Sequence, residues 1–186
     1  DIIDDIPYKG APNGAGSAGA HSGGRIRFGP DRFLYVTTGD NHDAQLPQDL
    51  RRLGGKVLRV NRDGTAAPGN RTPAGGDPRI FTYGHRNGYG LSFHPTTGEL
   101  WHAEIGPLGG DEVNVLVAGH NYGWPVVSMG RNYTGSLVSD KPWARDGMDN
   151  PRMFWVPSIS PSSLMFYDGD KFKGWKGSMF VGGLTT

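Results

Sequence analysis

One of the chain's six histidines stands where an imidazole could act as a general base. His21 lies in the glycine-rich segment His-Ser-Gly-Gly-Arg, directly before a strand-like run, and such a loop could direct its ring into a pocket. Asp40 ends the following pair of strand-like runs, and a strand out and a strand back would return its carboxylate towards His21. There it could orient the imidazole and stabilise its charged form. A solvated loop histidine and an aspartate that caps a turn are the alternative interpretations.

A second polar loop, Gly84-His-Arg-Asn-Gly88, precedes another hairpin-like segment, as the His21 loop precedes the first. Arg86 beside Asn87 offers several hydrogen-bond donors to a carbonyl or carboxylate group. A polar turn would have the same composition, and for an isolated segment of this kind that is the simpler interpretation.

The segment from Glu104 to Glu112 combines glycines and a proline with several acids. Gly106 and Pro107 would leave backbone carbonyls outside strand pairing, and Asp111 and Glu112 follow them. Carbonyl and carboxylate oxygens are hard ligands that suit Ca²⁺ rather than Zn²⁺. The segment is therefore a candidate calcium site, with a surface acidic turn as the alternative.

The elements that would position these residues are predominantly strands. The 186 residues include 31 Gly and 14 Pro, which disfavour helix interiors, and the seven Tyr, eight Phe and five Trp supply apolar surface for a core. Runs rich in β-branched and aromatic residues flank short turns in three similar hairpins, and further strands are expected between them, at 25–40, 90–104 and 164–183, and at 55–61 and 111–117.

A hairpin repeated with extra strands between its copies predicts an all-β β-propeller, since a propeller blade has four strands. The chain would be a single partial propeller domain over residues 1–186, covering about three to four blades, with a Gly/Ala-rich leading segment and site loop at 1–24. One short helix is expected between Asp43 and Leu53. An open half-propeller would expose sheet edges, so we expect the chain, which begins at Asp1, to be part of a larger closed ring.

The overall composition argues against several classes of partner. Nineteen basic and 18 acidic side chains give a net charge of +1, which marks neither a nucleic-acid binder nor a protein of anionic membranes. No apolar run is long enough to span a membrane, and no signal peptide opens the chain. Without cysteine, thiol catalysis and disulfides are excluded.

Taken together, these segments resemble the glucose/sorbosone dehydrogenase family, soluble six-bladed β-propeller aldose dehydrogenases that use pyrroloquinoline quinone (PQQ) and Ca²⁺. The resemblance runs over about residues 20–184, and its strength lies in the order and spacing of motifs that are each weak alone. The matching motifs are His21-Ser-Gly-Gly-Arg25, Gly29-Pro-Asp31, Leu34 to Asp40, Gln45, Gly55 to Asn61, Tyr83 to Asn87, Gly106-Pro107, Gly110-Asp-Glu112, Asn121-Tyr-Gly-Trp-Pro125 and Pro157 to Ser162.

The resemblance implies oxidation of an aldose at C1 to the lactone, by proton abstraction and hydride transfer to PQQ. His21 would be the general base and Asp40 its carboxylate partner. Arg86 would bind the quinone carbonyl beside the carbon that accepts hydride, and Asn87 and Gln45 would be further PQQ contacts. A small-molecule sugar, an external electron acceptor and a secreted or periplasmic location are implied in the same way, and a homodimer is compatible with it.

Two calcium sites are implied as well. Backbone oxygens of Gly106 and Pro107 would hold the Ca²⁺ that bridges to PQQ, whereas Glu112 and the backbone of Tyr122 would belong to a second, structural site. The chain departs from the family at Ile105, where a polar Gln or His is common before the Gly-Pro pair. It also ends before the basic residues that pair with the PQQ carboxylates.

Two other functions fit the same fold. A non-catalytic propeller of this family could bind a carbohydrate or a protein at its mouth, and it would ignore quinone. A Ca²⁺-dependent propeller hydrolase such as a lactonase would cleave lactone with the metal alone.

Overall fold

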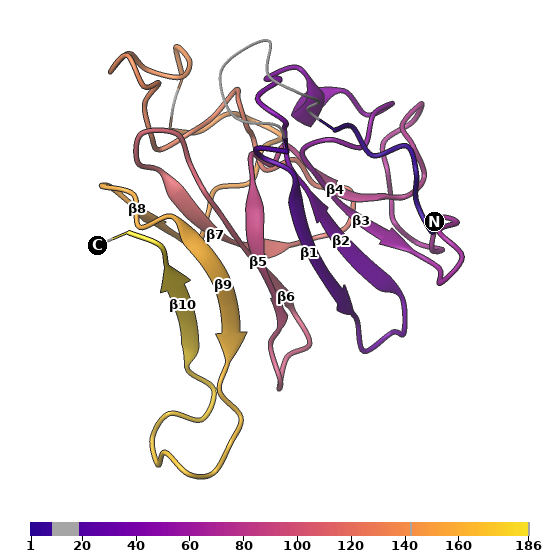
Figure 1. Ribbon diagram of the computed structural model, residues 1–186, viewed down its shortest axis with the longest axis vertical. Coiled ribbons are helices and arrows are strands. Elements are labelled where there is room, and N and C mark those ends of the chain that lie inside the picture. The colour runs from indigo at the N-terminus through magenta and orange to yellow at the C-terminus, as the bar shows by residue number, and fades with distance from the viewer. Residues whose placement is uncertain (9–18, 142, 186) are drawn as a thin grey trace.

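The computed structural model describes residues 1–8, 19–141 and 143–185, and within these ranges the chain forms three antiparallel sheets and one 3₁₀ turn (Figure 1). The first two sheets have four strands each in sequence order, and the third has two. The strands are β1 (Gly23–Phe28), β2 (Leu34–Thr38), β3 (Lys56–Val60) and β4 (Ile80–Tyr83); β5 (Gly88–Phe93), β6 (Leu100–Glu104), β7 (Asp111–Leu116) and β8 (Met153–Trp155); and β9 (Pro161–Phe166) and β10 (Met179–Gly183).

Each sheet begins with one of the three predicted hairpins, which confirms them. Phe28 pairs with Leu34 across the β1–β2 turn, and Phe93 pairs with Leu100 across the β5–β6 turn. In the first turn the Asp31 carboxylate accepts the backbone N–H of Phe33 at 3.2 Å, so an aspartate in this turn closes the chain reversal locally.

The first strands of the three sheets lie side by side, β1 next to β5 and β5 next to β9 (Figure 1). This is the arrangement of successive propeller blades around an axis, and it confirms the all-β propeller class. Arg25 on β1 joins all three blades, because its Nε donates to the Tyr89 carbonyl on β5 at 2.6 Å and its Nη2 to the Ser162 carbonyl on β9 at 3.1 Å.

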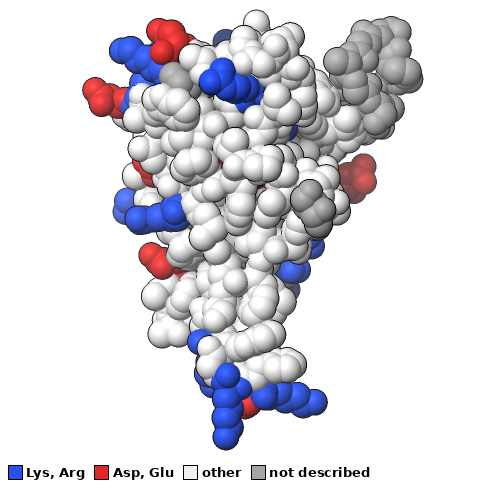
Figure 2. Space-filling view, turned by 90° about the vertical axis from the view of Figure 1, so that its left-hand side faces the viewer, with Lys and Arg blue, Asp and Glu red and all other residues white. Residues whose placement is uncertain are grey.

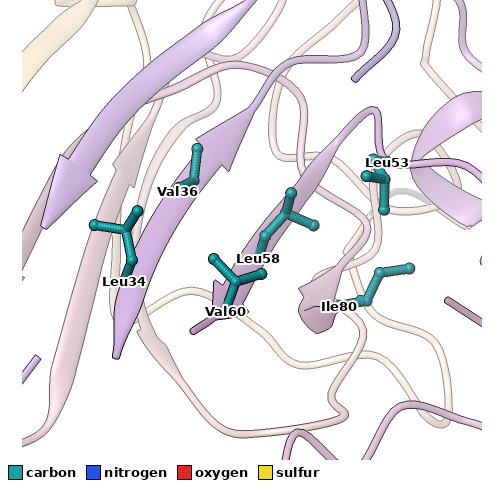
Figure 3. Packing of buried hydrophobic residues seen from close by; sticks show 6 residues of the cluster. All are labelled: Leu34, Val36, Leu53, Leu58, Val60 and Ile80. Atoms are coloured by element: carbon teal, nitrogen blue, oxygen red, sulfur yellow. The ribbon is translucent and has the colours of Figure 1, made fainter. Parts of the chain in front are cut away.

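The apolar core lies in layers within and between the blades. One cluster fills the outer part of the first blade, where β2, β3 and β4 face the segment after the 3₁₀ turn (Figure 3); its members are Leu34, Val36, Leu53, Leu58, Val60 and Ile80. A second cluster packs Tyr35 and Val57 of the first blade against Leu91 and Leu100 of the second. Strand β3 is thus buried on both faces, which fixes the loops at its ends.

The prediction of a helix between Asp43 and Leu53 is wrong. Only a 3₁₀ turn, η1 (Leu46–Gln48), forms there. Pro47 has no N–H to offer a longer helix. The carbonyls of Leu46 and Pro47 instead accept hydrogen bonds from the fully buried Lys56 ammonium at 2.6 and 3.2 Å. The buried lysine side chain therefore shares carbonyl acceptors that a longer helix would have used for its own hydrogen bonds.

The face shown in Figure 2 carries both signs of charge in small groups, and basic side chains gather at the narrow end of the molecule, where the β9–β10 loop projects (Figure 1). Among the described residues there is no helix long and apolar enough to cross a membrane. Of the predicted leading segment, positions 9–18 lie outside the described residues, and 19–22 form the turn that enters β1.

Candidate functional site

The predicted pair of His21 and Asp40 is formed. His21 Nδ1 lies 2.7 Å from Asp40 Oδ1, and the Asp40 side chain is almost completely buried. The hairpin β1–β2 brings the two together, and Gly39 makes the close approach possible. A Cβ atom at position 39 would lie 1.7 Å from the carbonyl oxygen of His21, so this position requires glycine.

Further groups hold the Asp40 carboxylate in place. The backbone N–H of His42 donates to Oδ1 at 3.0 Å, and the indole N–H of Trp124 donates to Oδ2 at 2.8 Å. The His42 ring stacks on His21 with the ring centroids 3.6 Å apart. Asp40 is also tied to the second blade, because its own N–H donates to the Arg86 carbonyl at 2.8 Å.

Arg86 brings a cation to the same place from the loop before β5. Its Nη1 donates to the carbonyls of Ile105 at 3.0 Å and Gly106 at 2.6 Å, and its Nη2 lies 3.3 Å from the Tyr133 hydroxyl. The guanidinium carbon lies 5.3 Å from the centre of the Trp124 ring. These contacts fix a permanent positive charge beside the histidine–carboxylate pair.

The pair and the guanidinium line one pocket of about 150 Å³. Pro107 and Tyr133 form part of its wall and also border a larger, mainly apolar depression of about 530 Å³. An imidazole, a carboxylate and a guanidinium thus converge on one cavity, which shares two lining residues with the larger depression. This combination is suited to proton abstraction next to developing negative charge.

A smaller cavity of about 10 Å³, room for roughly one water or ion, lies behind Trp124. Glu104, Glu112, Gly106 and Tyr122 are among its lining residues. Burial, together with the neighbouring Glu104 carboxylate, raises the pKa of Glu112 well above its ordinary value. Among the described residues, the Asn114 amide donates a hydrogen bond to Glu112 Oε2 at 3.2 Å. A carboxylate in this setting is stabilised by a proton or by a cation.

Glu104 belongs to a fully buried polar cluster beneath Arg86. Its Oε1 lies 2.9 Å from His85 Nδ1, and its Oε2 accepts the backbone N–H of Arg86 at 2.6 Å. Burial alone would raise the pKa of Glu104, but His85 and these hydrogen bonds outweigh it and lower the pKa. His102 completes this cluster, 3.7 Å from Glu104 Oε1. The carboxylate therefore anchors the Arg86 loop to β6.

Asp111 was predicted only as one of two acids near a metal, and the structure gives it a different role. Its buried carboxylate accepts the N–H groups of Gly106, Ile159 and Ser160 and the Ser158 hydroxyl, at 2.7–2.9 Å. It ties the Gly106 loop of the second blade to the segment that enters β9.

The predicted PQQ contacts Gln45 and Asn87 do not line this pocket. Gln45 is exposed before η1, where its N–H donates to Asp43 Oδ1 at 3.0 Å, and it borders a separate depression. Asn87 is buried, and its Oδ1 accepts the N–H of Gly23 at 3.1 Å, so it fixes the loop that follows His21. The structure thus brings together His21, Asp40, Arg86 and Pro107 at one cavity and Gly106, Glu112 and Tyr122 at the other.

Sequence reasoning missed Trp124 and Tyr133 as members of the site. The motif Asn121 to Pro125 drew attention only through the resemblance, with a role for Tyr122 but none for the tryptophan. Nothing in the local sequence relates Trp124 to Asp40, because the contact joins a loop after β7 to the end of β2.

The profile of the Glucose / Sorbosone dehydrogenase family matches residues 8–186, nearly the whole chain. The chain belongs to this family. The aldose sugar dehydrogenase YliI of Escherichia coli is 36% identical over 171 residues, which cover 90% of this chain and 46% of the relative. The chain therefore spans about half the length of such relatives.

Solved structures agree with this assignment. The apo-form of the soluble aldose sugar dehydrogenase from Escherichia coli aligns with a TM-score of 0.82 at 35% identity, over 87% of this chain and 48% of that one. The PQQ-bound aldose sugar dehydrogenase from Streptomyces coelicolor aligns with a TM-score of 0.64 at 33% identity, over 86% of this chain and 48% of that one.

Proposed function

We propose that the complete protein oxidises an aldose sugar at C1 to the lactone, with PQQ as the oxidant and Ca²⁺ as a second cofactor. The observation that carries the proposal is the 2.7 Å contact between His21 and Asp40 in the cavity that also holds the Arg86 guanidinium. A base alone could serve many reactions, whereas a base beside a fixed cation suits the removal of a proton while charge develops nearby.

The chain's own residues divide the work as follows. Asp40 binds Nδ1 of His21, which leaves Nε2 to accept the proton of the C1 hydroxyl. The carboxylate stabilises the imidazolium that results. Arg86 supplies positive charge where electron density accumulates on the oxidant, and Pro107 and Tyr133 restrict the space around it.

The cavity residues fit a quinone with several anionic groups. Arg86 lines the pocket, and its Nη2 lies 3.3 Å from the Tyr133 hydroxyl. No carboxylate among the described residues pairs with this guanidinium, so its positive charge is available to an anionic ligand. When bound, PQQ would supply a two-electron oxidant. Gln45 and Asn87 stay proposed contacts, although the structure places the first outside the pocket and uses the amide oxygen of the second for Gly23.

The oxygen ligands at the small cavity and those at the pocket would bind Ca²⁺ in different ways. At the small cavity, Glu112 lacks a cationic partner among the described residues, and backbone oxygens such as that of Tyr122 would add hard ligands. At the pocket, the Gly106 carbonyl already accepts Arg86 Nη1 at 2.6 Å. A carbonyl oxygen has a second lone pair, so it could serve Arg86 and Ca²⁺ together, with Pro107 beside it.

The proposal extends to the setting of the enzyme. An external electron acceptor would take up the two electrons that the sugar loses in each turnover, which completes the electron balance. By resemblance to the family we also propose a secreted or periplasmic location, and a homodimer is compatible with this assignment.

The test is an absorbance titration of the complete protein with PQQ and Ca²⁺, followed by an aldose. We expect the quinone band to shift on binding and then to change to that of the reduced form. His21→Ala should abolish sugar oxidation while PQQ still binds, and retained turnover would remove His21 as the base. Protein that binds a carbohydrate but no PQQ would be a binding propeller, and cleavage of lactone with Ca²⁺ alone would identify a hydrolase.

A further inference from the structure

Trp124 contacts both Asp40 and Arg86 and borders both cavities of the candidate site. Its indole Nε1 donates to Asp40 Oδ2 at 2.8 Å, the Arg86 guanidinium lies over its ring, and the same side chain borders both the 150 Å³ pocket and the small ion-sized cavity. The backbone on either side is fixed. Its N–H donates to the Gly84 carbonyl at 2.9 Å, and its carbonyl accepts Gln48 Nε2 at 2.7 Å.

We propose that Trp124 is a positioning residue that holds the Asp40 carboxylate, and through it the His21 ring, in the orientation needed for proton abstraction. This inference deepens the proposed function and rests on it. Trp124 acts through Asp40 and is not itself placed against the reacting atoms.

The two oxygens of the Asp40 carboxylate have different hydrogen-bond donors. Oδ1 accepts hydrogen bonds from His21 Nδ1 and from the backbone N–H of His42, whereas among the described residues Oδ2 accepts one from the Trp124 indole. The χ2 torsion of an aspartate has no sharply preferred value, so a carboxylate that is hydrogen-bonded through one oxygen only can rotate about χ2. A turn of Asp40 moves Oδ1 relative to His21, and the imidazole then loses the partner that fixes its tautomer and direction.

Because Trp124 also packs against Arg86, its hydrogen bond to Asp40 can be tested separately from its aromatic packing. Arg86 packs on the face of the ring, with the guanidinium carbon 5.3 Å from its centre, and Phe offers a face as well. Trp124→Phe therefore removes the N–H donor to Asp40 and keeps an aromatic face for Arg86. Trp101→Phe is the matched control, because the buried Trp101 indole N–H on β6 has no hydrogen-bond partner in the part of the chain that the structure describes.

In the complete protein we expect Trp124→Phe to lower kcat for aldose oxidation by about 10- to 100-fold, the range of one hydrogen bond to a charged group. KM and the affinity for PQQ should stay within about twofold, and Trp101→Phe should match the wild type. If Trp124 acts through Asp40, adding Trp124→Phe to an Asp40→Ala variant should cause no further loss. Unchanged kcat in the single variant, or fully additive losses in the double variant, would overturn the proposal.

A measurement without substrate separates this inference from the proposed function. In the wild type the Trp124 indole proton should exchange slowly with solvent in NMR spectra, and Asp40→Ala should speed that exchange more than tenfold. A wild-type protein that shows this protection but oxidises no aldose would contradict the proposed function and leave only a structural contact. An active wild type in which Asp40→Ala does not change the exchange would refute the role of Trp124.

Discussion

Replacing Asp111 by Asn is a demanding test of the structure around the pocket, because the change is nearly isosteric and affects only charge and hydrogen bonding. The carboxylate accepts the Gly106 N–H on Oδ1 and the N–H groups of Ile159 and Ser160 on Oδ2, while Ser158 donates to both oxygens. In the variant one of the two oxygens becomes an NH₂ group. It must face at least one backbone N–H that now has no acceptor.

The less costly orientation places the NH₂ group at the Oδ1 position, because only one backbone N–H is lost there, that of Gly106. A buried donor without a partner costs about 1–3 kcal/mol, and the remaining bonds lose the added strength of a charged acceptor. We therefore expect Asp111→Asn to lower the free energy of unfolding by about 2–4 kcal/mol. Asp111→Ala, which removes all the acceptors, should cost more.

Urea denaturation of the wild type and the variant gives this difference directly, and hydrogen exchange of the Gly106 amide locates it. Asp170→Asn is the control, since Asp170 is largely exposed and its one ionic partner within the described ranges is the exposed Lys176; it should change stability by less than about 0.5 kcal/mol. A loss below 0.5 kcal/mol for Asp111→Asn, with the Gly106 amide still protected, would refute the network and the orientation argument together.

Three further predictions concern single residues. Burial lowers the pKa of Lys56 to about 7, below its ordinary value of 10.5, so between these pH values the unfolded chain binds more protons than the folded chain. The free energy of unfolding should therefore rise with pH from about 7 to 10. In urea titrations at several pH values, Lys56→Met should flatten that rise. Gly39→Ala should destabilise the protein by about 2–4 kcal/mol in thermal or urea unfolding, since its Cβ would collide with the His21 carbonyl. Removal of Ca²⁺ by a chelator should lower the melting temperature, and Glu112→Gln should abolish that response; equal shifts in both proteins would exclude Glu112 as a ligand.

The parts of the fold that were predictable depend on local sequence. Turn residues such as Asp31 reverse the chain within a few positions, so the hairpins could be located from turn chemistry and β-rich flanks. The contact of His21 with Asp40 followed from one of these hairpins, since a strand out and back returns the chain to its start. The expected helix does not form, because Pro47 has no N–H to donate and the Leu46 and Pro47 carbonyls bind Lys56, a residue beyond the predicted segment.

The parts that were not predictable depend on contacts between blades. Trp124 reaches Asp40 from a loop after β7, and no pattern near either residue encodes that distance. Asp111 could equally have been a surface acid, and only the approach of the segment entering β9 makes it a buried acceptor of several hydrogen bonds. Side chains whose partners come from another blade require the packed structure before a role can be assigned.

The contacts of Arg25 have a consequence for how the molecule opens. A side chain of the first blade donates to carbonyls on the first strands of the second and third blades, so the third blade cannot separate without losing an interaction that originates two blades away. Local unfolding of β9 should then be thermodynamically coupled to β1, and amides on both strands should exchange as a single cooperative unit. Substitution of Arg25 would divide that unit, which limits how freely a blade of this protein can be exchanged or duplicated during evolution.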